Sequence, residues 1–178
     1  VLIDVTGKNS FPIPVGRFRE PMSSLRRAKY VIVSKSNLVP PEDKQDWLDK
    51  IAKQGFTVEK GNLFFLNYII GEPYPLKNPQ QRSMWNDIRG TTALASSIAR
   101  PDIFKNMVEM RSPIREQYVF SDHYIWTQKD LVKIKEDMKK KNLKFLLITE
   151  KDEVKIRHLD HNDMSIYVAP LAVELTPE

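Results

Sequence analysis

Short apolar runs alternate along this chain with longer segments in which apolar residues recur every three or four positions. Near-continuous apolar runs predict strands that are buried on both faces of a parallel sheet. Such runs, or shorter apolar stretches flanked by polar residues, predict strands at residues 1–5, 30–34, 90–96, 118–120 and 145–148. Helical spacing of apolar residues is found at 41–54, 101–108 and 127–138. This alternation of strands and helices predicts an α/β fold with parallel sheets.

Further segments complete the predicted elements. Residues 56–70 and 165–175 each predict one strand, and residues 152–159 predict a short helix. Residues 71–86 are polar and contain several prolines, so no regular structure is expected there. Together with the aromatic-rich run before it, this stretch is typical of a connector between domains.

The composition is that of an ordinary globular protein with room for one core or two small ones. The chain has no cysteine, which excludes disulfides and thiolate metal sites, and its three histidines do not favour a zinc site. No apolar run approaches the roughly 18 residues of a membrane span, and no signal peptide is recognisable. Because the sequence runs from Val1 straight into a strand without a methionine, we expect an upstream portion to be missing.

Positive charge gathers on one predicted helix, although the net charge is only +5. Six lysines crowd this helix and the turn after it: Lys133, Lys135, Lys139, Lys140, Lys141 and Lys144. A solvated helix face explains such a run without a ligand, whereas a phosphorylated substrate or an anionic membrane surface would also favour it. No aromatic residues interleave with these lysines, so nucleic acid is not expected as a partner.

Polar residues follow three predicted strands at the point where each strand ends. Ligands of open α/β sheets bind beyond the carboxyl ends of the strands, which makes these positions candidates for binding or catalysis. The residues are Ser97, Arg100, Asp122, His123, Lys151 and Asp152. We expect them to lie at one edge of one sheet.

His123 is the candidate for proton transfer, because imidazole titrates near neutral pH and a carboxylate, Asp122, precedes it. A histidine at a strand end can equally be structural and hydrogen-bonded to a neighbour. The other histidines, His158 and His161, fall in a charged stretch and are expected at the surface.

A helix cap is an alternative interpretation of the residues after the last of these strands. Thr149 fits the cap position, and Asp152 fits the third position of the helix. The cap does not explain Lys151, because the dipole at the start of a helix disfavours a cation.

A loop rich in proline and glycine, residues 12–21, carries Arg17, Arg19 and Glu20 at its tip. A surface turn is one interpretation, and a phosphate site is the other, because guanidinium groups bind phosphate bidentately. Neither of the glycine-rich nucleotide motifs, G-x-x-x-x-G-K-S/T and G-x-G-x-x-G, occurs in the 178 residues. A loop that binds the phosphates of a nucleotide would therefore lie outside these 178 residues.

Five motifs, in order along nearly the whole chain, resemble those of the tetraacyldisaccharide 4'-kinases, the lipid A 4'-kinases of Gram-negative bacteria. They are PVGRFREP at 14–21 (family P-A-G-P-L-R-E-P), RAKYVIV at 27–33, SIARPDIF at 97–104 (family G-I-A-x-P-x-x-F), FSDHY at 120–124 (family F-x-D-H-H/Y) and LITEKDEVK at 147–155 (family L-x-T-E-K-D-x-V-K). The chain departs from the family at Val15, Arg17 and Ser97, which replace alanine, proline and glycine.

The resemblance implies a kinase that transfers the γ-phosphoryl group of ATP, with Mg²⁺, to the 4'-hydroxyl of a glycolipid, tetraacyldisaccharide 1-phosphate. It implies that residues 1–55 end a P-loop-type nucleotide domain, residues 56–86 form a two-stranded β linker, and residues 87–178 form a smaller Rossmann-like domain with a parallel sheet. The Walker A loop would precede Val1, so this chain alone is expected to be inactive. The enzyme would act peripherally at the cytoplasmic face of the bacterial inner membrane.

The resemblance also implies residue roles. His123 and Asp122 would be catalytic, with His123 assisting the proton of the attacking hydroxyl as the partner of an upstream aspartate, and Asp122 orienting its ring. Glu20 would also bind the metal, and Lys151 would anchor the lipid phosphate or form a closing contact between domains. Substrate or phosphate contacts are expected from Arg17, Arg19, Glu20, Lys151, Arg100 and Ser97.

Two other functions stay open at this point. One is a non-catalytic α/β module that binds an anionic glycolipid or a nucleotide but transfers nothing. The other is a basic domain associated with nucleic acid, which the lack of interleaved aromatic residues disfavours. A phosphate-binding loop upstream of Val1 would distinguish the kinase from both.

Overall fold

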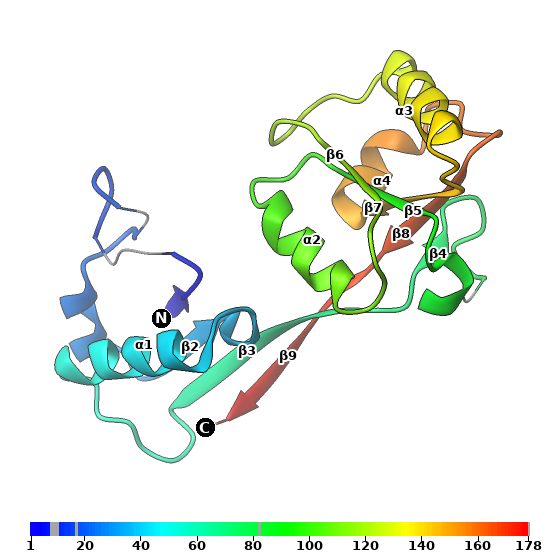
Figure 1. Ribbon diagram of the computed structural model, residues 1–178. Coiled ribbons are helices and arrows are strands. Elements are labelled where there is room, and N and C mark those ends of the chain that lie inside the picture. The colour runs from blue at the N-terminus through cyan, green and yellow to red at the C-terminus, as the bar shows by residue number, and fades with distance from the viewer. Residues whose placement is uncertain (8–10, 17, 82, 178) are drawn as a thin grey trace. The chain divides into compact units, whose positions relative to one another are not determined.

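The chain forms two compact units, Val1–Ile69 with Val173–Glu178 and Ile70–Ala172 (Figure 1). They are seen in a computed structural model that describes residues 1–7, 11–16, 18–81 and 83–177. Each unit contains a sheet with parallel strands and its own hydrophobic core. This confirms the predicted α/β fold with parallel sheets.

The first unit contains a four-stranded sheet in the order β1-β2-β3-β9. Its strands are β1 (Leu2–Asp4), β2 (Val31–Ser34), β3 (Leu63–Ile70) and β9 (Leu171–Pro177). β2 pairs in parallel with both β1 and β3. Two short 3-10 helices, Met22–Arg27 and Ser36–Leu38, flank β2 in sequence.

Helix α1 (Pro41–Lys53) packs on this sheet. Pro41 starts it, since a missing N–H costs nothing in the first turn, and acidic and basic residues at its two ends suit the helix dipole. Trp47 and Ile51 face the core beside Val31 and Val33 of β2. The indole N–H of Trp47 also donates to the backbone oxygen of Val5 at 3.1 Å, so α1 is fixed to the segment after β1.

The predicted strand over 56–70 starts later, at Leu63. Asn62 explains this, because its side chain donates to the Thr57 oxygen and accepts from the Glu59 N–H, both at 2.9 Å. Gly61 completes the turn with a φ of +83°, a conformation that glycine adopts without strain. The polar contacts of Asn62 therefore hold residues 57–62 as a turn.

The second unit contains a five-stranded sheet in the order β4-β8-β7-β5-β6. The strands are β4 (Tyr74–Pro75), β5 (Thr92–Ser96), β6 (Glu116–Val119), β7 (Phe145–Thr149) and β8 (Ser165–Ala169). Within the described part of this sheet, only β4 runs antiparallel, beside β8. β4 and a 3-10 helix at Trp85–Ile88 correct the expectation that residues 71–86 lack regular structure.

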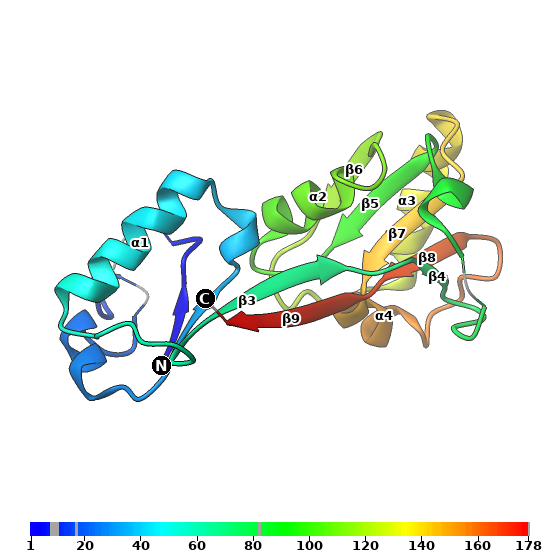
Figure 2. The same cartoon turned by 90° about the horizontal axis from the view of Figure 1, so that it is seen from below.

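Three helices cover the sheet of the second unit: α2 (Pro101–Glu109), α3 (Gln128–Lys140) and α4 (Glu150–Ile156). Leu131 and Ile134 of α3 and Ile156 of α4 share one core cluster with alternate residues of β5 and β7. Figure 2 shows α2 on the side of this sheet opposite α4. α4 begins two residues before the predicted helix at 152–159, because Thr149 caps it.

The predicted strand over 165–175 is divided into β8 and β9. Pro170 lies between them, and proline has no N–H to donate to a sheet. β8 lies between β4 and β7 in the sheet of the second unit, whereas β9 is an edge strand of the first sheet, beside β3. The single predicted strand over 165–175 therefore contributes one strand to each of the two sheets.

Strands β5, β6 and β7 are parallel neighbours, so their carboxyl ends lie at one edge of the sheet. Ser97 follows β5, Asp122 and His123 lie in the loop after β6, and Lys151 and Asp152 follow β7. The predicted convergence of these positions on one sheet edge is confirmed.

Helix α3 begins with a capping box. The Thr127 hydroxyl accepts from the Asp130 N–H, and the Asp130 carboxylate accepts from the Thr127 N–H at 2.9 Å. Burial acts to raise the pKa of Asp130, but hydrogen bonds from Thr127 and Tyr124 outweigh it and hold this pKa below its ordinary value.

We expect Thr127→Ala to lower the free energy of unfolding by about 1 kcal/mol, because the first turn of α3 loses its side-chain acceptor. Urea denaturation followed by circular dichroism measures this. Ser165→Ala, at an exposed position of β8, is the control and should change stability by less than about 0.5 kcal/mol. Equal stability of the Thr127 variant and the wild type would show that the cap contributes nothing.

Candidate functional site

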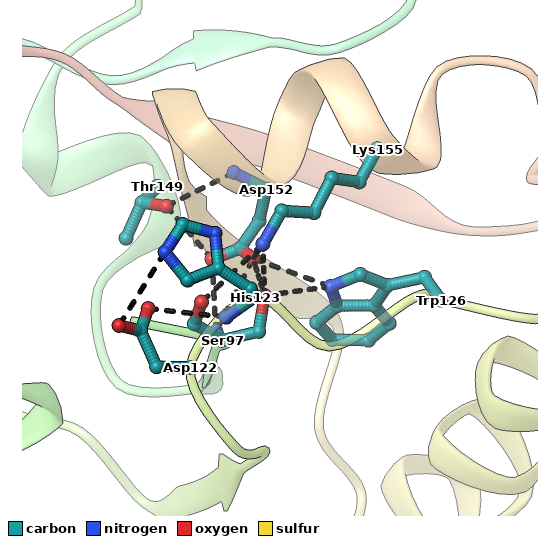
Figure 3. Close-up of polar contacts among 7 residues, drawn as sticks. All are labelled: Ser97, Asp122, His123, Trp126, Thr149, Asp152 and Lys155. Carbon is teal, nitrogen blue, oxygen red and sulfur yellow. Dashed lines mark hydrogen bonds and ion pairs between the residues drawn. The ribbon is translucent and has the colours of Figure 1, made fainter. Parts of the chain in front are cut away.

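A buried carboxylate, that of Asp152, lies at the carboxyl edge of the second sheet (Figure 3). Its side chain is 0% exposed and accepts hydrogen bonds from three elements. The Ser97 backbone N–H donates to both carboxylate oxygens, at 3.1 and 3.2 Å, and the Ser97 hydroxyl donates to Oδ1. The indole N–H of Trp126 donates to Oδ1 at 3.2 Å, and the Thr149 hydroxyl donates to Oδ2 at 2.7 Å.

Lys155 supplies the opposite charge. Its Nζ lies 3.7 Å from Oδ1 of Asp152 and donates to the Ser97 hydroxyl at 2.7 Å and to the Ser97 backbone oxygen at 3.3 Å. A buried charge is tolerated only when it is paired and hydrogen-bonded. Asp152 meets both conditions, and we call Ser97, Trp126, Thr149, Asp152 and Lys155 the Asp152 network.

The local sequence explains why these side chains meet. Thr149 is the N-cap of α4 and accepts from the Asp152 N–H at 3.1 Å, so the helix-cap interpretation of both residues is confirmed. Lys155 follows Asp152 by three residues and therefore lies on the same face of the helix. The cap also positions the Asp152 carboxylate so that it contacts Ser97, the residue that follows β5.

The loop after β6 carries the predicted catalytic pair between aromatic side chains. Phe120 packs against Tyr124 and Trp126, with ring centroids 4.8 and 4.4 Å apart. The Tyr124 N–H donates to the Ser121 oxygen at 3.1 Å and closes a turn. Trp126, at the end of the loop, donates its indole N–H to the Ser97 hydroxyl as well, at 3.2 Å.

His123 lies within that turn, and its side chain is 91% exposed. Its φ of +60° is in the left-handed region, which histidine enters more readily than most residues. The carboxylate of Asp122 accepts from the His123 N–H at 3.1 Å, while Nε2 of the ring lies 3.7 Å from Oδ2 of Asp122. The Asp122 carboxylate therefore fixes the backbone of His123 by a hydrogen bond. The Nε2 atom of the His123 ring is too far from this carboxylate for a hydrogen bond.

The other predicted residues of this edge differ in their surroundings. Ser97 is buried, and its hydroxyl is part of the Asp152 network. Arg100 donates to the Asp102 carboxylate at 3.1 and 2.9 Å, and these bonds hold the pKa of Asp102 below its ordinary value. Lys151 is exposed on the first turn of α4. Contacts of Ser97, Arg100 and Lys151 with a substrate stay predictions.

The arginine loop belongs to the first unit. Arg17 lies outside the described residues. Arg19 and Glu20 are exposed and line a cavity of about 670 Å³, and the Glu20 carboxylate is paired with the guanidinium of Arg27. The described residues hold no cluster of three or more histidine or acidic side chains that could bind a metal ion. Glu20 as a metal ligand stays a prediction.

Sequence reasoning missed two members of the Asp152 network and misjudged one histidine. Lys155 could have been found from its spacing of three residues after Asp152. No local pattern indicates that Trp126 reaches Asp152, since 26 residues separate them. His158 is exposed as expected, whereas His161 is partly buried, and its Nδ1 is buried without a hydrogen-bond partner in the described part of the chain.

The family described as "Tetraacyldisaccharide-1-P 4'-kinase", LpxK, matches residues 1–178. The chain belongs to this family. The tetraacyldisaccharide 4'-kinase of Bdellovibrio bacteriovorus is 32% identical over 170 residues, which cover 93% of this chain and 48% of that protein. The enzyme of the same name from Bacteroides fragilis is 29% identical over 176 residues, covering 92% of this chain and 46% of that protein. This membership confirms the resemblance seen in the five sequence motifs.

A solved structure shares the fold. It is the crystal structure described as the "apo" form of LpxK from Aquifex aeolicus in complex with ATP, with a TM-score of 0.58 and 16% identity. The match covers 99% of this chain and 47% of that one. This chain spans about half the length of the LpxK relatives that it matches. Among the helices in the described ranges, none has the length and apolar character needed to cross a membrane.

We expect Asp152→Ala to lower the free energy of unfolding by about 3 kcal/mol or more, because it leaves the Lys155 ammonium and the buried donors of Ser97 and Trp126 without their acceptor. Urea denaturation measures the loss.

Asp163→Ala is the matched control. This substitution removes a carboxylate that is 81% exposed and lies 3.0 Å from Lys135, and it should cost at most about 1 kcal/mol. If the two variants proved equally stable, the burial of Asp152 would not contribute to the fold as argued.

Proposed function

We propose that the complete protein containing this chain transfers the γ-phosphoryl group of ATP to the 4'-hydroxyl of tetraacyldisaccharide 1-phosphate, a step of lipid A biosynthesis. The observation that carries the proposal is the match of the LpxK family to residues 1–178. The accessible imidazole of His123 at the carboxyl edge of a parallel sheet supports it, because ligands of such sheets bind there.

His123 assists the movement of the proton that leaves the attacking hydroxyl. Phosphoryl transfer depends mainly on positioning and on neutralising charge, so the contribution of this chain is to place a proton-handling group at the acceptor. Imidazole suits that task near neutral pH. Asp122 holds the backbone of the residue that carries it, through the bond to the His123 N–H.

The cations and the hydroxyl of the predicted site bind phosphate and substrate. Guanidinium and ammonium groups near a transferring phosphoryl group lower the cost of its developing charge. In the first unit Arg19 is exposed, and in the second Lys151 is exposed and Arg100 is partly buried against Asp102. The residues assigned to binding are Arg17, Arg19, Glu20, Lys151, Arg100 and Ser97.

ATP and Mg²⁺ are the cofactors of the proposed reaction, and Mg²⁺ neutralises phosphate charge when it is bound. Mg²⁺ typically takes one or two carboxylates together with phosphate oxygens. Glu20 is the candidate carboxylate of this chain, but it is paired with Arg27, and the described residues form no complete metal site. We assign no step through the ion to this chain.

The domain assignment and the location follow from the same proposal. Residues 1–55 end the nucleotide domain, residues 56–86 provide the linker, and residues 87–178 form the smaller domain that carries His123. The enzyme acts at the cytoplasmic face of the bacterial inner membrane, where its glycolipid substrate resides, and nucleic acid is not a partner. The alternative is a module that binds an anionic glycolipid or a nucleotide without transferring phosphate.

In the complete enzyme we expect His123→Ala to lower kcat and kcat/KM together by about 10²–10⁴-fold, because general acid–base assistance acts in the transition state. The KM for the glycolipid should change little. Transfer of labelled phosphate from ATP to the glycolipid measures both constants. Full turnover combined with reduced thermal stability would identify His123 as a structural residue.

Two companion variants sharpen this test. Asp122→Asn should give a milder loss, since the amide oxygen still accepts from the His123 N–H. His158→Ala should leave turnover unchanged, because His158 is an exposed residue outside the proposed site.

Residues 1–178 alone should bind ATP poorly and show no transfer, because they contain no glycine-rich loop that cradles phosphates. Calorimetric titration with ATP and the same transfer assay test this expectation. Turnover by the purified 178-residue chain would contradict it.

A further inference from the structure

We propose that Trp126 is a positioning residue that, through the carboxylate of Asp152, holds the loop presenting Asp122 and His123 in one conformation. The role in turnover rests on the function proposed above, whereas the anchoring itself does not. The anchor is the bond between the indole N–H of Trp126 and Oδ1 of Asp152, at 3.2 Å (Figure 3).

The loop is fixed at both of its ends. At its start, the Phe120 N–H donates to the Ser96 oxygen at 2.9 Å and extends the pairing of β6 with β5. At its end, Trp126 is 2% exposed and donates to the Asp152 network. The residues in between include His123, which has a left-handed backbone conformation. Without an anchor, the loop would leave this conformation.

The acceptor of this anchor is itself immobile. Asp152 is tied to the residue after β5 by the Ser97 N–H, and to the start of α4 by Thr149. Trp126 therefore couples the loop after β6 to the segments that follow β5 and β7. A hydrogen bond to a carboxylate is stronger than one between neutral groups, which suits the fixing of a loop.

Packing alone does not require the indole nitrogen. The ring of Trp126 packs against that of Phe120, with centroids 4.4 Å apart and planes tilted by 49°, and a phenylalanine ring would keep most of that apolar contact. Without the N–H, Asp152 still accepts from Ser97 and Thr149 and stays paired with Lys155. Trp126→Phe therefore removes the anchor while leaving the buried carboxylate satisfied.

Trp85→Phe is the matched control, because it makes the same substitution at a comparable depth in the same unit. Trp85 is 6% exposed, and its indole nitrogen has no hydrogen-bond partner among the described residues. Any effect that comes from the smaller ring alone will appear in both variants, and only Trp126→Phe removes a bond to the network.

In the complete enzyme we expect Trp126→Phe to lower kcat by about 10–100-fold, with the KM values for ATP and glycolipid changed by less than about 2-fold, because misplacing a catalytic group costs rate more than binding. In a His123→Ala background the same substitution should have no further effect, since Trp126 acts through His123. Trp85→Phe should leave kcat unchanged in both backgrounds.

Hydrogen exchange tests the anchor without any assay of transfer. The backbone amides of His123 and Tyr124, which donate hydrogen bonds within the loop, should exchange at least about 10-fold faster in Trp126→Phe and at the wild-type rate in Trp85→Phe. Unchanged exchange in Trp126→Phe overturns the proposal, as does an equal loss of kcat with and without His123. If the wild-type enzyme transfers no phosphate, the proposed function fails, and faster exchange in Trp126→Phe still supports the anchor.

Discussion

One buried negative charge, that of Asp152, shapes the carboxyl edge of the second sheet. A carboxylate removed from water has to be surrounded by donors and a cation, and this chain draws them from the ends of β5 and β7 and from the loop after β6. The segments that leave three neighbouring strands are thereby joined at one point. The exposed residue His123 therefore depends on the fully buried residue Asp152.

Two different residues organise this edge and face the solvent. The charge that organises the edge is hidden and saturated with hydrogen bonds, whereas the imidazole proposed to meet a substrate has few protein contacts and is open to solvent. Among the described residues, the His123 ring has one contact with a charged group, Asp122 at 3.7 Å, which is beyond hydrogen-bond distance, so the ring can turn toward an incoming ligand. The backbone of the loop stays in place while the side chain rotates.

Apolar spacing predicted most of the elements, since Val31 to Ser34, Phe145 to Ile148 and the core face of α3 were all evident from the sequence. It failed where a polar side chain or a proline overruled a run of β-forming residues, as Asn62 does before β3 and Pro170 does between β8 and β9. The rule that ligand-binding residues follow parallel strands predicted which positions meet at one sheet edge, and β5, β6 and β7 bring them there. The contact of Trp126 with Asp152 could not be predicted, because it depends on the distance between two loops in the folded chain.

The division of one apolar run at Pro170 has a consequence for any dissection of the protein. The last strand of the chain, β9, pairs in the sheet of the first unit, and its residues from Val173 onward belong to that unit, although Ile70–Ala172 form the second. The first unit is therefore discontinuous in sequence. A stop codon after Ala172, or a protease cut near Pro170, would spare the sheet of the second unit and expose the hydrogen-bonding edge of β3 in the first. An isolated first unit needs its C-terminal strand supplied, either as a separate peptide or by rejoining the chain in a different order.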